Sequence, residues 1–177
     1  MRFETLFDDH ARDVLAFALR RVVRPEDAAD VTAETFLVAW RRLDGVPHGD
    51  EARPWLFGVA RKVISNQTRS ELRRDRLGAK LREQLTGIEF DHADDVATSS
   101  LVRDALSRLP DDDRELLRLT AWEGLAPTEI ATVMSIPAAT VRTRLHRARE
   151  RMRHELVALG HVVDGERVLA VCDEGES

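Results

Sequence analysis

Apolar residues recur at three- and four-residue steps along most of the chain, which is the spacing of amphipathic helices. The first such run comprises Phe3, Phe7, Val14, Ala18 and Val22, with Leu15 and Leu19 beside them. A second predicted helix begins at Pro25, carries acids in its first turns and arginines in its last, as the helix dipole favours, and ends near Gly45. A third runs from Trp55 to Arg76 and becomes basic toward its end. We therefore expect one small helical domain over residues 1–76.

The second half of the chain also has the apolar spacing of helices, after a segment of different composition. Residues 77–100 contain glycines, a serine and threonine cluster, and the acids Glu89, Asp91, Asp94 and Asp95, which is typical of a flexible acidic linker. A short helix then ends at Pro110, and an acid-capped helix ends at Gly124. Two further helices complete a domain over residues 101–159. Because no strand pattern occurs before residue 160, the predicted fold class is all-α, with two small helical domains.

Composition and length favour a globular protein without a membrane segment. Of the 177 residues, 43% are hydrophobic and 33% are charged, and no run of about 18 apolar residues could span a bilayer. The N-terminus lacks the apolar core of a signal peptide, so we expect a cytoplasmic protein without membrane insertion. The single cysteine, Cys172, can form no internal disulfide and lacks the paired spacing of a zinc site. We expect no metal and no cofactor.

The stretch "APTEIATVMSIPAATVRTRLHRAR", residues 126–149, has the layout of a helix-turn-helix, with a short helix, a tight break at residues 135–137 and a longer helix. Val141, Leu145, Ala148 and Met152 are spaced to face the core. The positions left exposed at the start of this helix, where a recognition helix meets base edges, are Thr140, Arg142, Thr143, His146 and Arg147. Arg149, Arg151 and Arg153 are better placed for phosphates. The alternative is a solvated helix whose arginines pair with Glu150 and Glu155; the preceding helix and break favour DNA.

Positive and negative charges are concentrated in different parts of the sequence. The formal net charge is -5, yet residues 138–156 carry six arginines against two glutamates, a net +4, and the tail from Val157 carries five acids against Arg167, a net -4. An acidic protein gains little unspecific attraction to DNA, so we expect a partner that helps to hold it there. Residues 160–177 form an acidic tail, with a hairpin signal at Asp164 and Gly165. This tail is either a weak competitor for the basic helix or an appendage without a role.

Two stretches together resemble a known family. "PAATVRTRLHRAR" resembles region 4.2 of the extracytoplasmic-function sigma factors, and "DAADVTAETFLVAW" followed by "RPWLFGVARKVISN" resembles their region 2. The resemblance extends to about Leu159 with the motifs in the family's order. It implies a transcription initiation subunit, not itself an enzyme, whose partners are core RNA polymerase and promoter DNA. Region 2 would bind the minus-ten element and region 4 the minus-thirty-five element. An anti-sigma factor is a further candidate partner.

The resemblance also assigns roles to individual residues. Asp30 and Glu34 match the positions that dock on the polymerase clamp helices, and their four-residue spacing places both on one helix face. We expect Val31, Phe36, Leu37 and Trp40 to supply mostly the packing side of that helix. The alternative for the two acids is an exposed face that improves solubility. Residues expected to hold the single-stranded minus-ten element are Trp55, Arg61, Lys62, Asn66, Arg69 and Arg73, with Arg74 on the same basic face; a core position is the alternative for Trp55.

Several positions depart from the family pattern. Ala33 stands where a glutamine usually precedes the docking glutamate, which weakens part of the expected polymerase contact. Ala52 and Gln67 replace residues that are commonly aromatic, so few stacking residues remain for the minus-ten element. Ala139 replaces a common glycine, with little expected effect.

Two other functions compete with a sigma factor. A stand-alone helix-turn-helix regulator would bind duplex DNA as a dimer, but it leaves "DVTAETFLVAW" and the basic third helix unexplained. An adaptor or RNA-binding protein would use the arginine helix on RNA or on an acidic partner. Binding to core polymerase separates these functions.

Overall fold

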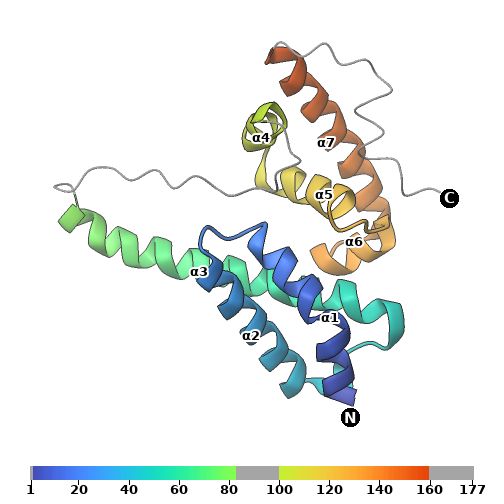
Figure 1. The fold of residues 1–177 in the computed structure, drawn as a ribbon. Helices are drawn as coiled ribbons and strands as arrows, with labels where there is room; N and C mark the ends of the chain where they lie inside the picture. The colour runs from blue at the N-terminus through green and yellow to red at the C-terminus, as the bar shows by residue number, and fades with distance from the viewer. Residues whose placement is uncertain (1, 83–99, 160–177) are drawn as a thin grey trace. The chain divides into compact units, whose positions relative to one another are not determined.

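The computed structural model describes residues 2–82 and 100–159, with side chains of the third helix described as far as Gln67. These residues fall into two compact units, 2–82 and 100–159 (Figure 1). Every regular element in them is helical, which confirms the predicted all-α fold of two helical domains. None of the described helices is long and apolar enough to cross a membrane. Most of the predicted linker, and the whole tail with Cys172 and its hairpin signal, lie outside the described residues.

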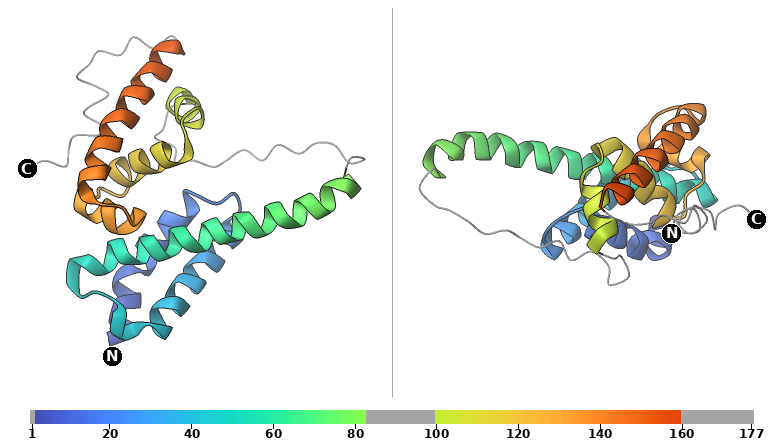
Figure 2. Two further views of the ribbon diagram at one scale, coloured as in Figure 1. Left: turned by 180° about the vertical axis from the view of Figure 1, so that it is seen from behind. Right: turned by 90° about the horizontal axis from the view of Figure 1, so that it is seen from above.

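The first unit consists of α1 (Arg2–Leu19), α2 (Pro25–Arg41) and α3 (Ala52–Arg82). The rings of Phe17 in α1 and Phe57 in α3 stack in its core, with centroids 4.7 Å apart and planes 13° from parallel. Val14, Val31 and Leu56 are fully buried around them. The first half of α3 packs against α1 and α2, and its second half extends beyond both (Figure 2).

Helix α3 is longer than the sequence pattern predicts. It begins at Ala52 instead of Trp55, since Pro54 is tolerated in a first helical turn, where a missing backbone N–H leaves no bond unmade. It continues to Arg82, because the residues after Arg76 include only one poor helix former, Gly78. The connection before it contains the short turns η1 (Leu43–Gly45) and η2 (Gly49–Glu51). The guanidinium of Arg2 holds this connection, donating to the carbonyl oxygens of Leu43, at 2.7 Å, and of Val46.

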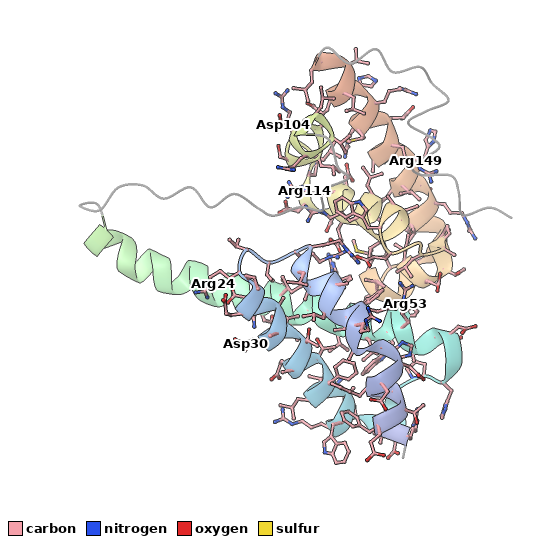
Figure 3. All side chains as sticks on the ribbon, viewed as in Figure 1. Arg24, Asp30, Arg53, Asp104, Arg114 and Arg149 are labelled. Carbon is pink, nitrogen blue, oxygen red and sulfur yellow. The ribbon has the colours of Figure 1, made fainter. Side chains whose placement is uncertain are left out.

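The second unit consists of α4 (Ser100–Ser107), α5 (Asp111–Ala121), α6 (Pro127–Met134) and α7 (Ala138–Ala158). Its largest fully buried apolar side chains come from the last three helices: Leu116, Leu119, Ile130, Val133 and Val141. Arg114, at the start of α5, caps the end of α4 (Figure 3). Its guanidinium donates to the carbonyl oxygens of Leu106 and Leu109, both at 3.0 Å, and of Ser107 at 3.3 Å. The short α4 is thereby fixed to α5.

Candidate nucleic-acid and partner interfaces

Helices α6 and α7 are joined by the three residues Ser135, Ile136 and Pro137, as the sequence predicts. Ser135 adopts the left-handed conformation, with φ 56° and ψ 43°. The N–H of Ile136 donates to the carbonyl of Ala131 at 3.1 Å, and that of Ser135 donates to Thr132 at 3.4 Å. This pair of bonds is a Schellman motif, which ends α6 and turns the chain sharply. Pro137, with its restricted φ, then precedes the first turn of α7.

The start of α6 is capped from one side only. Pro127 occupies the first helical position, and Ala126 at the N-cap has no side-chain acceptor. The Glu129 carboxylate accepts a hydrogen bond from the Ala126 N–H at 2.8 Å. This contact is the return half of a capping box, whose forward half requires a side-chain oxygen at the N-cap.

Helix α7 carries its charge in two stripes, one on each side of the buried stripe. The buried residues Val141, Leu145, Ala148 and Met152 are those predicted, and Leu156 extends them. The residues one position before each of the first four buried ones form what we term the Arg144 stripe: Thr140, Arg144, Arg147 and Arg151. The residues one position after each of the same four form the Arg142 stripe: Arg142, His146, Arg149 and Arg153. In these stripes Thr140 and Arg149 are half-buried, and the other side chains are exposed, as is Thr143 opposite the core.

The arginines of the two stripes differ in their partners: two of the Arg144 stripe reach acids of α5. On the Arg144 stripe, Arg144 lies 3.8 Å from a carboxylate oxygen of Asp112, and Arg151 binds Asp113. The guanidinium of Arg151 is therefore engaged within the unit, and its contact with a phosphate stays a prediction. Among the described residues, Arg142, Arg147 and Arg153 form no ion pair and no hydrogen bond through their side chains.

The glutamates of α7 have partners other than its arginines. Glu150 lies 3.7 Å from His146 on the same helix, and Glu155 lies 3.5 Å from Arg108 of the α4 region. Within the described part of the chain neither glutamate pairs with an α7 arginine. This disagrees with the alternative in which Glu150 and Glu155 neutralise the helix.

Helix α3 places most of its predicted DNA-contacting positions on one stripe. Positions 55, 62, 66, 69 and 73 are seven, four, three and four residues apart, which on a continuous helix is one face. Trp55 is half-buried, whereas Lys62 and Asn66 are exposed. Arg61 does not share this stripe: it is half-buried and lies about 100° from Lys62 around the axis. The side chains of Arg69 and Arg73 are outside the described part.

Helix α2 presents an exposed face that includes the two predicted acids. Asp30 and Glu34 are exposed, and Leu37 and Arg41 continue their spacing on the same face. Asp30 projects on the side of α2 away from α1 (Figure 3). Val31 and Phe36 pack inward as predicted.

The prediction that Leu37 and Trp40 also pack inward was wrong. Their exposed fractions are 39% and 59%. Thr35 takes the inward position instead, fully buried, with its hydroxyl donating to the Val31 carbonyl at 2.7 Å. The Trp40 ring packs nearly perpendicular to the Phe3 ring, with centroids 4.9 Å apart and planes at 84°.

Two features of these surfaces were missed from the sequence. The exposure of Leu37 and Trp40 was one, and the pairing of the α5 aspartates with α7 arginines was the other. The sequence pattern assigns the run "DDD" at residues 111–113 only to a helix cap, although six arginines in a later helix are a signal that these acids have partners. Within the described residues no three or more His, Cys, Asp or Glu side chains are grouped to hold a metal ion.

Family models match both units of the chain. The model described as Sigma-70 region 2 matches residues 6–74, and the model described as Sigma-70, region 4 matches residues 99–152. The chain is 36% identical over 162 residues to the ECF RNA polymerase sigma factor SigL of Mycobacterium tuberculosis, covering 88% of this chain and 89% of the relative. It is 33% identical over 160 residues to the RNA polymerase sigma-H factor of Pseudomonas aeruginosa, covering 84% and 82%.

Solved structures agree with the fold. The sigma factor RpoE of Bartonella quintana, in complex with the anti-sigma factor NepR, superposes with a TM-score of 0.65 at 24% identity, covering 90% of this chain and 98% of that one. CnrH, in complex with the cytosolic domain of CnrY, superposes with a TM-score of 0.58 over 88% of each chain. The chain therefore belongs to the extracytoplasmic-function sigma factors, which direct core RNA polymerase to promoters and initiate transcription.

Proposed function

We propose that this sigma factor divides promoter initiation among three surfaces: α7 reads the minus-thirty-five element, the α3 stripe holds the melted minus-ten strand, and the exposed face of α2 docks on core polymerase. The observation that carries the proposal is the start of α7. There, Arg142 and Arg147 project without an intradomain partner in the described residues, next to a Schellman turn that fixes the helix.

Direct readout at α7 follows from the chemistry of the exposed side chains. Arginine donates two parallel hydrogen bonds to the O6 and N7 atoms of guanine, and threonine and histidine complement it on neighbouring bases. Thr140, Arg142, Thr143, His146 and Arg147 would supply this readout. Arg149 and Arg153 lie further along the Arg142 stripe, where phosphate oxygens flank the major groove.

The α3 stripe suits a single strand. Lys62 and Asn66 are exposed on it, and Trp55 is half-buried near the start of the helix. A cation, an amide and an aromatic surface are the groups that hold phosphates, a flipped base and a stacked base respectively. Arg69 and Arg73 follow at the same helical spacing. Arg61 is assigned a supporting role here because it lies off the stripe.

The face of α2 suits a protein partner with basic charge and an apolar spot. Asp30 and Glu34 supply two exposed carboxylates, and Leu37 lies on the same face with 39% of its surface exposed. Burying this leucine between charged groups on docking would stabilise the complex. The alternative, an acidic face that only improves solubility, gives Leu37 no role.

The family relatives suggest regulation by a further protein. RpoE of Bartonella quintana and CnrH were each solved in complex with another protein, which for RpoE is an anti-sigma factor. By similarity, this chain is held by an anti-sigma factor until a signal releases it, and it acts in the cytoplasm, where core polymerase and the chromosome are.

Reconstitution tests the proposal. The purified full chain is mixed with core polymerase, the complex is isolated by pull-down, and transcription is measured from a library of promoter fragments with and without the chain. We expect a stable complex and transcripts that begin at a common set of promoters only when the chain is present. A chain that binds duplex DNA but not core polymerase would instead be a stand-alone regulator.

A further inference from the structure

Three consecutive aspartates at the start of α5 each contact a different arginine. Asp111 lies 3.3 Å from Arg114 within α5 itself. Asp112 lies 3.8 Å from Arg144 of α7, and Asp113 binds Arg151 of α7. The first contact is local, whereas the other two cross to the helix that carries the Arg144 stripe.

The two crossing contacts converge from different turns of α7. Arg144 and Arg151 are seven residues apart, which is two turns or about 10 Å along the axis, yet they reach adjacent carboxylates. Both lie on the Arg144 stripe, beside the buried stripe. On the other side of that buried stripe, Arg142 and Arg153 form no ion pair with any described residue. The positive charges of Arg144 and Arg151 are thus neutralised toward α5, whereas those of Arg142 and Arg153 have no ion-pair partner among the described residues.

This asymmetry affects two different contributions to DNA binding. An arginine that reaches a phosphate strengthens binding to every sequence, and each such contact steepens the fall of log K with log salt concentration by about 0.9. Contacts to base edges discriminate between sequences. A carboxylate bound to an arginine competes with phosphate, so it lowers the first contribution without lowering the second. The useful quantity for a promoter reader is the ratio of specific to non-specific affinity.

We propose that Asp112 and Asp113 are specificity-determining residues, which withhold Arg144 and Arg151 from the phosphates of duplex DNA and so limit binding to sequences without a promoter. The proposal rests on the DNA-reading function of α7 proposed above. Asp113, whose side chain is 11% exposed, anchors the contact between the helices. Asp112 and Arg144 are 60% and 45% exposed, so theirs is the pair that phosphate can reach and compete for.

The test uses the full chain assembled with core polymerase. Binding is measured to a promoter duplex and to a duplex of equal length with the minus-thirty-five element scrambled, between 50 and 200 mM salt. With Asp112→Asn we expect tighter binding to both duplexes at 50 mM salt and a lower ratio between them. The freed arginine adds one phosphate contact, so affinity should fall by about 3- to 4-fold more than for the wild type across this salt range.

Matched variants separate release of Arg144 from a simple change of net charge. Asp111→Asn removes the same charge one residue away, but Asp111 pairs only with Arg114 among the described residues, so the salt slope should change less. Where Asp112 is retained, Arg144→Ala should change DNA affinity little. Combined with Asp112→Asn, it should cancel the gain in affinity. Equal slopes for Asp111→Asn and Asp112→Asn, or a gain that persists without Arg144, would overturn the proposal. A wild-type complex that binds both duplexes equally would instead overturn the proposed function of α7.

Discussion

The carboxylate of Asp113 in α5 binds the guanidinium of Arg151 in α7 across 38 residues of sequence. Asp113 is 7% exposed, so it is one of the few charged residues buried in the described part of the chain. A buried carboxylate without a partner loses the free energy of hydration that it had in the unfolded chain. Arg151 therefore stabilises the α4–α7 unit.

Arg151→Ala is expected to lower the free energy of unfolding of this unit by about 1–3 kcal/mol, the cost of leaving a buried ionic acceptor unsatisfied. Urea unfolding of the unit can be followed in the full chain through Trp122, after Trp40 and Trp55 have been changed to Phe. Arg153→Ala is the control, because Arg153 is exposed and forms no ion pair in the described region. Equal losses for the two variants would contradict a structural role of the Asp113 contact.

Ser135→Gly is expected to stabilise the same unit by about 0.5–1 kcal/mol. Serine in the left-handed conformation is strained by its Cβ atom, and glycine is not, although glycine loses more entropy on folding. Ala131→Gly, in the interior of α6, should instead destabilise by about 1 kcal/mol. The Trp122 unfolding curves measure both, and a less stable Ser135→Gly variant would show that the strain at the turn is compensated elsewhere.

Ala126→Ser is expected to complete the capping box at the start of α6. The new hydroxyl can accept a hydrogen bond from the N–H of Glu129, while the Glu129 carboxylate keeps its bond to the N–H of residue 126. The gain should be about 0.5–2 kcal/mol, measured as above. Glu129→Ala alone should lose stability. If Ala126→Ser lowers stability, then its serine does not adopt the capping rotamer.

Helix periodicity predicted the parts of the fold that depend on local spacing. Val141, Leu145 and Met152 were placed in the core from their spacing alone, and α7 has them there, because one stripe of a helix must face its neighbours. Periodicity failed at α2, where Thr35 is buried and Leu37 is exposed. A threonine that bonds the carbonyl four residues earlier satisfies its hydroxyl, so hydropathy alone misassigns it.

Pairings between distant residues could not be derived from spacing. The contact of Arg151 with Asp113 depends on how α5 packs against α7, and nothing local to either residue specifies it. For the same reason the spacing along α7 does not show that Arg144 and Arg151 pair with α5.

Asp30→Lys combined with Glu34→Lys is expected to abolish binding to core polymerase, because two carboxylates on the proposed docking face become repulsive cations. Asp8→Lys combined with Asp9→Lys is a matched control. It makes the same change in net charge at exposed positions of the same unit, on α1. Circular dichroism checks that both variants remain helical, and pull-down measures binding. Loss of binding in both variants would indicate a general charge effect and not a docking face.

Arg142→Ala is expected to change which minus-thirty-five sequences the polymerase complex prefers, whereas Arg153→Ala should weaken binding to all sequences alike. Both arginines belong to the Arg142 stripe and are exposed, but they are eleven residues apart along α7. Arg142 lies in the second turn, where a recognition helix meets base edges, and a bidentate contact to guanine discriminates by about 1–3 kcal/mol.

Selection of binding sites from a randomised duplex library distinguishes these two effects. For Arg142→Ala we expect relaxed preference at one position of the consensus. For Arg153→Ala we expect the wild-type consensus with a salt slope reduced by about 1. If Arg142→Ala returns the unchanged consensus, Arg142 does not read a base. Thr140 and Thr143, at the start of α7, would then be the candidates for selecting the promoter.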